Sequence, residues 1–313
     1  MKSISVIIVS WNARDYLRDC LDSIRETGAS CVQEVIVVDN ASKDGSPEMV
    51  AKHFPEVTLI QSEENLGFAR ANNLAMKHAK GSILALVNSD VIVHPGCFEK
   101  LAAYLEQHPE VGMVGPRIIG GDGHLQRTCR KLPTLWNTLC RMLTFDRILP
   151  DWQMFSGFEV PYRDYDKYIE AEVLSGCFCV ARKKAVDEVG GMDERFFFYA
   201  EDIDWCKRFW DAGWKLMFVP DATATHFGGG STANAPLRYS IEILRATLKY
   251  WRKHYGIAGQ IACYFLILAH HGFRLVVRGI KQSLGIGRSI ESKYKLEKDF
   301  VCLRWLMTGK GVA

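Results

Sequence analysis

The sequence predicts an α/β fold in which a mostly parallel central sheet is followed by a C-terminal helical extension. Short, nearly continuous apolar runs alternate with helical patterns, which is typical of parallel strands buried on both faces. The charge changes along the chain: residues 1–236 carry 25 basic against 32 acidic residues, whereas residues 237–313 carry 14 against 4. We therefore expect an α/β domain over residues 1–235 and a basic amphipathic helical region over residues 236–313.

Four apolar runs are interpreted as buried strands of one sheet. The segments between them show helical stripes, one through Leu17 and Leu21 and another on the segment that Asn65-Leu-Gly-Phe introduces. A repeated βα unit of this kind predicts an open parallel sheet. The expected strands are Ile4–Ser10, Glu34–Asp39, Val57–Gln61 and Ser82–Asn88.

The second half of the α/β domain is less regular. Residues 130–170 mix aromatic residues with Pro and Asp, and we interpret them as a long segment that covers the site. Regular structure is expected to resume as a strand over Glu172–Ala181, a helix over Arg182–Val189, a helix over Asp202–Ala212 and a strand over Lys215–Val219.

The ten cysteines are scattered, without CxxC pairs. We interpret them as reduced thiols acting as small hydrophobic residues, which indicates a cytoplasmic protein. Met1 lies directly before the first expected strand, so no signal peptide is expected.

The C-terminal region is expected to hold two helices. Apolar residues from Leu237 to Tyr255 alternate spacings of four and three, and Ile261–Val277 is apolar but interrupted by charged residues and histidines. A transmembrane helix needs about 20 apolar residues, so we expect a helix lying on the inner face of the membrane. A helical hairpin packed on the protein, or on a second subunit of a homo-oligomer, is the alternative. These apolar stripes also argue against nucleic acid as a partner.

Three carboxylates, Glu201, Asp202 and Asp204, follow the aromatic run 196–199. An aromatic wall lowers the local dielectric and raises the pKa of a carboxylate towards that of a general base, whereas a place at a helix start lowers it. The sequence leaves the balance open. An acidic first turn that caps a helix is the alternative to a catalytic site.

A second acidic site, Asn88-Ser89-Asp90, ends the fourth expected strand. The tip of a buried strand is where an α/β protein holds a metal and a diphosphate, so Asp90 is predicted to bind Mg²⁺ or Mn²⁺. Its alternative role is to cap a helix starting near Pro95. His226, beside a glycine run, is a second candidate metal or phosphate contact, with a structural histidine as the alternative.

Polar residues also follow the first two strands, where ligands of open parallel sheets bind. Asp39 ends the second strand and could accept hydrogen bonds from a base or a ribose. Arg70, on the helix after Gly67, could neutralise a phosphate.

Six motifs occur in an order that resembles the family 2 glycosyltransferases, and the resemblance is closest to their bacterial rhamnosyltransferase-like branch. It covers residues 4 to about 230. The motifs are Val6-Ile-Ile-Val-Ser-Trp-Asn12, Val37-Val-Asp-Asn-Ala-Ser-Lys-Asp-Gly45, Asn65-Leu-Gly-Phe-Ala-Arg-Ala-Asn72, Asn88-Ser-Asp90, Leu174-Ser-Gly-Cys177 and Phe198-Tyr-Ala-Glu-Asp-Ile-Asp-Trp205.

This resemblance implies a Rossmann-like GT-A fold, a nucleotide-sugar donor, a divalent cation and inversion at the anomeric carbon. By position, Asp39 resembles the nucleotide-binding aspartate, Asp90 the last residue of the Asp-x-Asp motif, and Asp202 the base that deprotonates the acceptor. Asn88 replaces the first aspartate of that motif, which makes weaker or dispensable metal binding an open possibility. We further predict that Ser10, Asn12, Arg70, Asn88 and Ser89 contact the donor, and that Gly176, Glu201 and Trp205 contact the acceptor.

The expected function is therefore an inverting sugar transfer, at the cytoplasmic membrane face, onto a lipid-linked or polysaccharide acceptor in cell-envelope glycan synthesis. Deoxythymidine diphosphate (dTDP) rhamnose is the first choice of donor, before a UDP- or GDP-sugar. A sugar nucleotidyltransferase would need a basic Gly-rich loop after the first strand, where Ser10-Trp-Asn-Ala-Arg-Asp15 has no glycine. A non-catalytic membrane-associated scaffold with the same fold is a further alternative.

Overall fold

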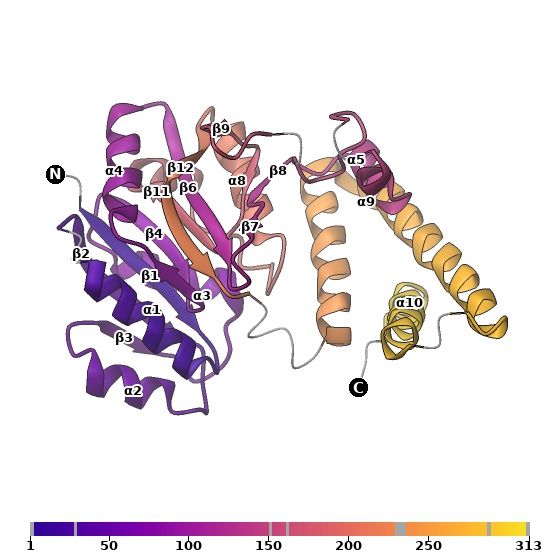
Figure 1. The fold of residues 1–313 in the computed structure, drawn as a ribbon, viewed down its shortest axis with the longest axis horizontal. Coiled ribbons are helices and arrows are strands. Elements are labelled where there is room, and N and C mark those ends of the chain that lie inside the picture. The colour runs from indigo at the N-terminus through magenta and orange to yellow at the C-terminus, as the bar shows by residue number, and fades with distance from the viewer. Residues whose placement is uncertain are drawn as a thin grey trace.

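The computed structural model describes residues 3–27, 30–149, 152–160, 163–228, 236–286 and 289–310. An α/β domain is built on one large sheet, and long helices project from one side of it (Figure 1). The strands are β1 (Ile4–Ser10), β2 (Val32–Asp39), β3 (Thr58–Gln61), β4 (Ile83–Asn88), β5 (Val91–Val93), β6 (Val111–Gly120), β7 (Leu125–Gln126), β8 (Cys129–Arg130), β9 (Ile169–Glu170), β10 (Val173–Leu174), β11 (Phe178–Arg182) and β12 (Lys215–His226).

The sheet confirms the predicted fold class and adds a mixed second half. Its strand order is β3-β2-β1-β4-β11-β6-β12-β5. The first four strands are parallel, as predicted. Strand β11 runs antiparallel to both of its neighbours, β4 and β6, whereas β6 and β12 are parallel to each other.

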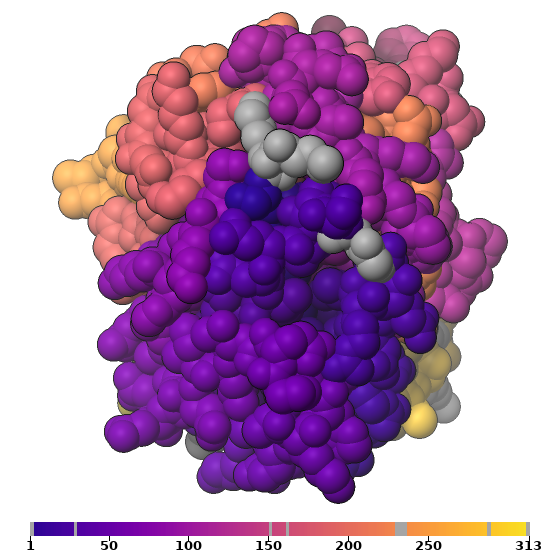
Figure 2. Space-filling view, turned by 90° about the vertical axis from the view of Figure 1, so that its left-hand side faces the viewer, coloured from indigo at the N-terminus to yellow at the C-terminus, as the bar shows by residue number. Residues whose placement is uncertain are grey.

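Ten helices occur among the described residues, and they cover both faces of the sheet and form the extension. The helices are α1 (Arg14–Thr27), α2 (Ser46–His53), α3 (Gly67–His78), α4 (Cys97–Gln107), α5 (Leu135–Met142), α6 (Phe145–Ile148), α7 (Lys183–Val189), α8 (Glu201–Asp211), α9 (Pro236–Ser283) and α10 (Ile290–Thr308). Viewed from the left of Figure 1, the molecule presents mainly its N-terminal half, and the extension shows only at the margins (Figure 2).

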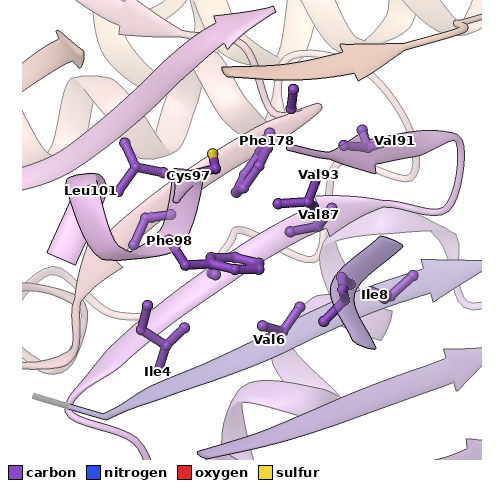
Figure 3. Packing of buried hydrophobic residues seen from close by; sticks show 14 of the residues in the cluster. Ile4, Val6, Ile8, Val87, Val91, Val93, Cys97, Phe98, Leu101 and Phe178 are labelled. Atoms are coloured by element: carbon purple, nitrogen blue, oxygen red, sulfur yellow. The ribbon is translucent and has the colours of Figure 1, made fainter. Parts of the chain in front are cut away.

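Apolar side chains on both faces of the sheet explain the continuous apolar runs. On β1, Ile4, Val6 and Ile8 pack on one face and Ile7 packs on the other, and all four are fully buried. Figure 3 shows the first face, where Phe98 of α4 lies among these residues and Phe178. The rings of Phe98 and Phe178 meet edge to face, with centroids 5.8 Å apart.

Two of the expected elements differ from the structure. The single strand expected over Glu172–Ala181 is interrupted by the turn 175–177, which separates β10 from β11. The segment 130–170 does not cover the site as expected: among its described residues only Arg130 lines the cavity described below, and its helix α5 packs on α9 (Figure 1). All ten cysteines are free and buried, in line with their expected role as small hydrophobic residues.

The C-terminal extension begins at Pro236, directly after residues that lie outside the described part of the chain. Helix α9 is broken at Gly256 (φ 68°, ψ −165°), and its two halves form an inverted V in Figure 1. The second half packs against α10, which the sequence analysis did not predict. His271 of α9 and Arg278 bind the buried Asp299 of α10. By length and composition alone, α9 satisfies the criteria for a membrane span.

Candidate active site

A cavity of about 330 Å³ opens at the carboxyl ends of β1 and β4. This is the edge at which open α/β sheets bind their ligands. Seven of the residues assigned from the sequence line it, although they come from four separate parts of the chain. These residues are Asn88, Ser89, Asp90, Gly176, Glu201, Asp202 and His226.

Asp202 lies in the first turn of α8, and two features fix its carboxylate. One oxygen, Oδ2, accepts a hydrogen bond from the backbone N–H of Gly176 at 3.2 Å, and Oδ1 accepts one from the N–H of Ile203 at 2.8 Å. A Cβ at position 176 would lie 3.2 Å from the Cβ of Asp202, so the close approach favours glycine. The carboxylate is thereby held at the cavity wall.

The chain enters α8 through two consecutive residues in the left-handed region, Tyr199 (φ 70°) and Ala200 (φ 65°). Non-glycine residues rarely adopt this conformation, and such strain concentrates at functional sites. The preceding Phe197 accepts a hydrogen bond from the N–H of Phe68. Its carbonyl lies only 2.4 Å from where a Cβ would stand on Gly67, which itself has φ 77°. Gly67 is therefore required for this loop to dock on α3.

Glu201 is buried beside Asp202, with 6% of its surface exposed, and its Oε2 has no hydrogen-bond partner. Burial, followed by the negative charge of Asp202, raises the pKa of Glu201 to about 8. Glu201 is thus a neutral carboxylic acid at neutral pH.

Asp90 and His226 lie side by side because β5 pairs with β12 in a register that sets Val91 opposite His226. Asp90 Oδ1 is 3.3 Å from His226 Nε2. Gln126 donates its Nε2–H to the carbonyl of His226 at 2.9 Å, so its Oε1 faces His226 Nδ1, also at 2.9 Å. An amide oxygen only accepts, so Nδ1 must carry a proton. In the neutral ring, the lone pair of Nε2 therefore points towards Asp90.

This arrangement suits a divalent cation. A carboxylate oxygen and an imidazole nitrogen are both metal ligands, and a ligating histidine commonly donates its other N–H to a neighbouring acceptor. No cluster of three or more His, Cys, Asp or Glu side chains suited to a metal occurs among the described residues. Phosphate oxygens and water would have to complete the coordination of an ion here.

Ser10 and Asp39 are paired across β1 and β2, and both are buried behind the cavity wall. Asp39 Oδ2 accepts the N–H of Ser42 at 2.9 Å, whereas Asp39 Oδ1 and Ser10 Oγ have no hydrogen-bond partner in the structure. Asn12 holds the same loop through the N–H of Lys43. The neighbouring Asn40 reaches the cavity itself.

The structure does not place Arg70 and Trp205 at the cavity. Arg70 is exposed and forms an ion pair with Glu64 at 3.4 Å, so it lies on the solvent side of α3. Trp205 is 1% exposed and donates its indole N–H to the carbonyl of Gly190, because it points from α8 into the core. The expected contact between Trp205 and an acceptor is therefore wrong.

Several residues that the sequence analysis missed also line the cavity. Arg130 of β8 brings a positive charge, and Tyr239 of α9 brings an aromatic ring that lies 5.6 Å from that of Phe198. Arg130 was hidden in the segment interpreted as a cover. Tyr239 has no signal in the sequence, because only the tertiary fold brings α9 to the site.

We expect Glu201→Gln to change the pH dependence of stability. The raised folded-state pKa of Glu201 gives stability that is fully present below about pH 4.5 and is lost as pH rises through about 8. In the glutamine variant this loss of stability does not occur, because glutamine does not ionise. Relative to wild type, its free energy of unfolding should therefore rise between pH 5 and pH 8 by about 1 kcal/mol or more, as measured by urea unfolding. Glu63→Gln, at an exposed position, is the control. Parallel pH curves for wild type and Glu201→Gln would contradict the assignment.

Comparison with known proteins agrees with this geometry. The profile of glycosyl transferase family 2 matches residues 5–190. An N-acetylglucosaminyl-diphospho-decaprenol L-rhamnosyltransferase of Mycobacterium tuberculosis is 28% identical over 246 residues, which span 74% of this chain and 78% of the relative. An amylovoran biosynthesis glycosyltransferase of Erwinia amylovora is 27% identical over 41% of this chain and 50% of its own length.

The fold has solved counterparts. A mannosyltransferase of Pyrobaculum calidifontis, determined in complex with GDP-Man and Mn²⁺, superposes with a TM-score of 0.61 at 18% identity, covering 97% of this chain and 87% of the other. The family profile spans more than half of the chain. This chain therefore belongs to glycosyl transferase family 2 and is a glycosyltransferase with a GT-A fold.

Proposed function

We propose that this glycosyltransferase moves a sugar, with inversion, from a nucleoside-diphosphate sugar to a hydroxyl of a lipid-linked or polysaccharide acceptor in cell-envelope glycan synthesis. One observation carries the proposal: the Asp202 carboxylate and the Asp90–His226 pair face the same cavity, at the carboxyl ends of the strands. In this arrangement, Asp202 would be the base, and the Asp90–His226 pair would mark the site of the donor diphosphate. Rhamnose is the proposed sugar, because the relative from Mycobacterium tuberculosis is a rhamnosyltransferase.

In the proposed reaction, Asp202 takes the proton of the acceptor hydroxyl while that oxygen attacks the anomeric carbon. The bond between the anomeric carbon and the diphosphate oxygen breaks, and the nucleoside diphosphate leaves with the electron pair. Gly176 keeps the carboxylate turned towards the cavity. Glu201, as a neutral acid, would donate a hydrogen bond to the acceptor without competing for its proton.

The donor would lie along the ends of β1, β2 and β4. The unpartnered Oδ1 of Asp39 and Oγ of Ser10 suit hydrogen bonds from a base or a ribose. Asn88 and Ser89 line the floor beside Asp90, and Arg130 offers a positive charge for a phosphate. Asp90 and His226 would hold Mg²⁺ or Mn²⁺. When bound, such an ion neutralises the charge that develops on the departing diphosphate.

The extension is proposed to bind the inner membrane surface, where a lipid-linked acceptor would be presented. Four exposed apolar side chains in the second half of α9, and a fifth directly after its last residue, follow one another at the helical spacings of eight, three, four and four, which place them on one face. They are Phe265, Phe273, Val276, Ile280 and Leu284. The excess of basic residues in this region favours anionic lipid.

Asp202→Asn should lower turnover by about 10²–10⁴-fold, since base assistance is lost. Donor binding should survive, because the variant is isosteric and its amide oxygen can still accept one of the two backbone hydrogen bonds, from Gly176 or from Ile203. Release of nucleoside diphosphate from dTDP-rhamnose, UDP-sugars and GDP-sugars measures turnover, and calorimetry measures binding. Turnover at the wild-type rate would remove Asp202 from the role of base, and absence of transfer in the wild type with every donor would favour a scaffold.

His226→Leu should weaken Mn²⁺ binding in the presence of UDP by about tenfold or more, because it removes one of two protein ligands. His94→Leu is the matched control, since His94 is likewise a side-chain hydrogen-bonded histidine, paired with Thr225 of β12, but does not line the cavity. Titration of Mn²⁺ followed by electron paramagnetic resonance gives both affinities. Equal affinities in the two variants would exclude His226 as a ligand.

Replacing Phe265, Phe273 and Val276 together by serine should lower co-sedimentation with vesicles of phosphatidylglycerol several-fold, since much of the exposed apolar face is lost. Leu125→Ser, an exposed apolar position in the α/β domain, serves as the control. Unchanged co-sedimentation of the triple variant would rule out this face as the membrane contact.

A further inference from the structure

The first turn of α8 is held by α9 on the side opposite the cavity. Asp204, two residues after Asp202, is fully buried and does not line the cavity. Its Oδ1 lies 2.6 Å from Lys253 Nζ and 2.7 Å from His254 Nε2, both on α9. Its Oδ2 lies 3.0 Å from Arg208 Nε, one turn further along α8. Burial raises the pKa of Asp204, but hydrogen bonds from His254 and Lys253 outweigh it, so the net pKa is lowered and the group is ionised.

The same stretch of α9 also holds the loop that leads into α8. Lys253 Nζ binds Asp193 Oδ2 at 2.7 Å, and Lys249 Nζ donates to the carbonyl of Arg195 at 2.6 Å. Three neighbouring side chains of α9 therefore contact the segment from Asp193 to Asp204 at four points. The same three side chains therefore hold both the first turn of α8 and the loop that precedes it.

Apolar packing reinforces the polar contacts at the strained residues. Tyr199 and Ala200, which have positive φ, pack together with Ile203 against a buried apolar cluster that includes Tyr250 and Trp251 of α9. A strained conformation persists only where its surroundings over-determine it. Here the surroundings include the first half of α9.

Helix α8 also has contacts that do not involve α9. Trp205 and Phe209 already anchor α8 in the core of the α/β domain, and Arg208 pairs with Asp204 within the helix. Arg208 also donates to the carbonyls of Val189 and Gly191. The additional contacts from α9 are made with the N-terminal end of α8, which carries Asp202.

We propose that Asp204 is a positioning residue for the reaction and that Lys253 and His254 complete the active site from outside the cavity, by fixing the first turn of α8 with Asp202 facing the acceptor. This inference rests on the proposed role of Asp202 as the base. It makes the first half of α9 a part of the catalytic machinery as well as a connection to the extension.

Asp204→Asn and His254→Phe test the proposal. Lys253 keeps Asp193, and Arg208 keeps its backbone carbonyls, so both variants should fold. The expected result is a fall in kcat of about tenfold or more, because a small displacement of a catalytic group is costly. The KM for the nucleotide sugar should stay within about twofold, because the donor side of the cavity is untouched. His254→Gln, whose amide can donate to Asp204, should recover most of the activity.

His271→Phe is the matched control, since it breaks a buried His–Asp pair of the same kind within the extension (His271 Nδ1 to Asp299 Oδ1, 2.9 Å). It should lower the melting temperature and leave kcat unchanged. The assay uses the full chain and the nucleotide sugar that gives the highest turnover among dTDP-rhamnose, UDP-sugars and GDP-sugars.

Two outcomes would overturn the inference. One is a wild-type kcat in Asp204→Asn and His254→Phe alongside an inactive Asp202→Asn, which would leave the proposed base in place. The other is an equal loss of kcat in His271→Phe, which would reduce the effect to general destabilisation. Full activity in Asp202→Asn would instead show that Asp202 is not the base, and absence of transfer in the wild type would contradict the proposed function itself.

Discussion

The site depends on one constraint of the sheet, the antiparallel insertion of β11 between β4 and β6. Because β11 runs against β4, its first residue, Phe178, pairs with Val87 near the end of β4. The turn at 175–177 therefore stands at the same edge of the sheet as Asn88 and Asp90. From there, the N–H of Gly176 reaches Asp202. If β11 ran parallel to β4, the turn that binds Asp202 would lie at the opposite edge of the sheet from Asp90.

The sequence was sufficient to predict those elements that are determined by the residues within them. Buried parallel strands read as uninterrupted apolar runs, so β1 was predicted with its correct bounds and β2 to β4 within two residues at either end. Asp90 and Asp202 stood out for a similar reason, since each follows an apolar or aromatic stretch that leaves a carboxylate at its end. The motifs that contain them also occur in the same order along the chain as in the family that the sequence resembles.

The sequence was insufficient to predict positions that depend on long-range strand pairing or on the direction of a side chain. The nearness of His226 to Asp90 follows from the register of β12 with β5, and Gln126, which sets the proton of that histidine, comes from a hairpin on β6. Helical phase explains the error at Trp205, since a residue three positions after Asp202 can point into the core while Asp202 faces the cavity. Arg70 likewise lies outside the cavity lining, because its helix face turns to solvent.

Gly256 has a consequence for the shape of the whole molecule. Its backbone angles fall in a region that is open essentially only to glycine. With any other amino acid at this position, the 48 residues of α9 would have to choose between a strained bend and a straight rod about 70 Å long. The direction in which the second half of α9 and α10 leave the α/β domain, and with it their orientation relative to the cavity, thus depends on a single hydrogen atom in place of a side chain.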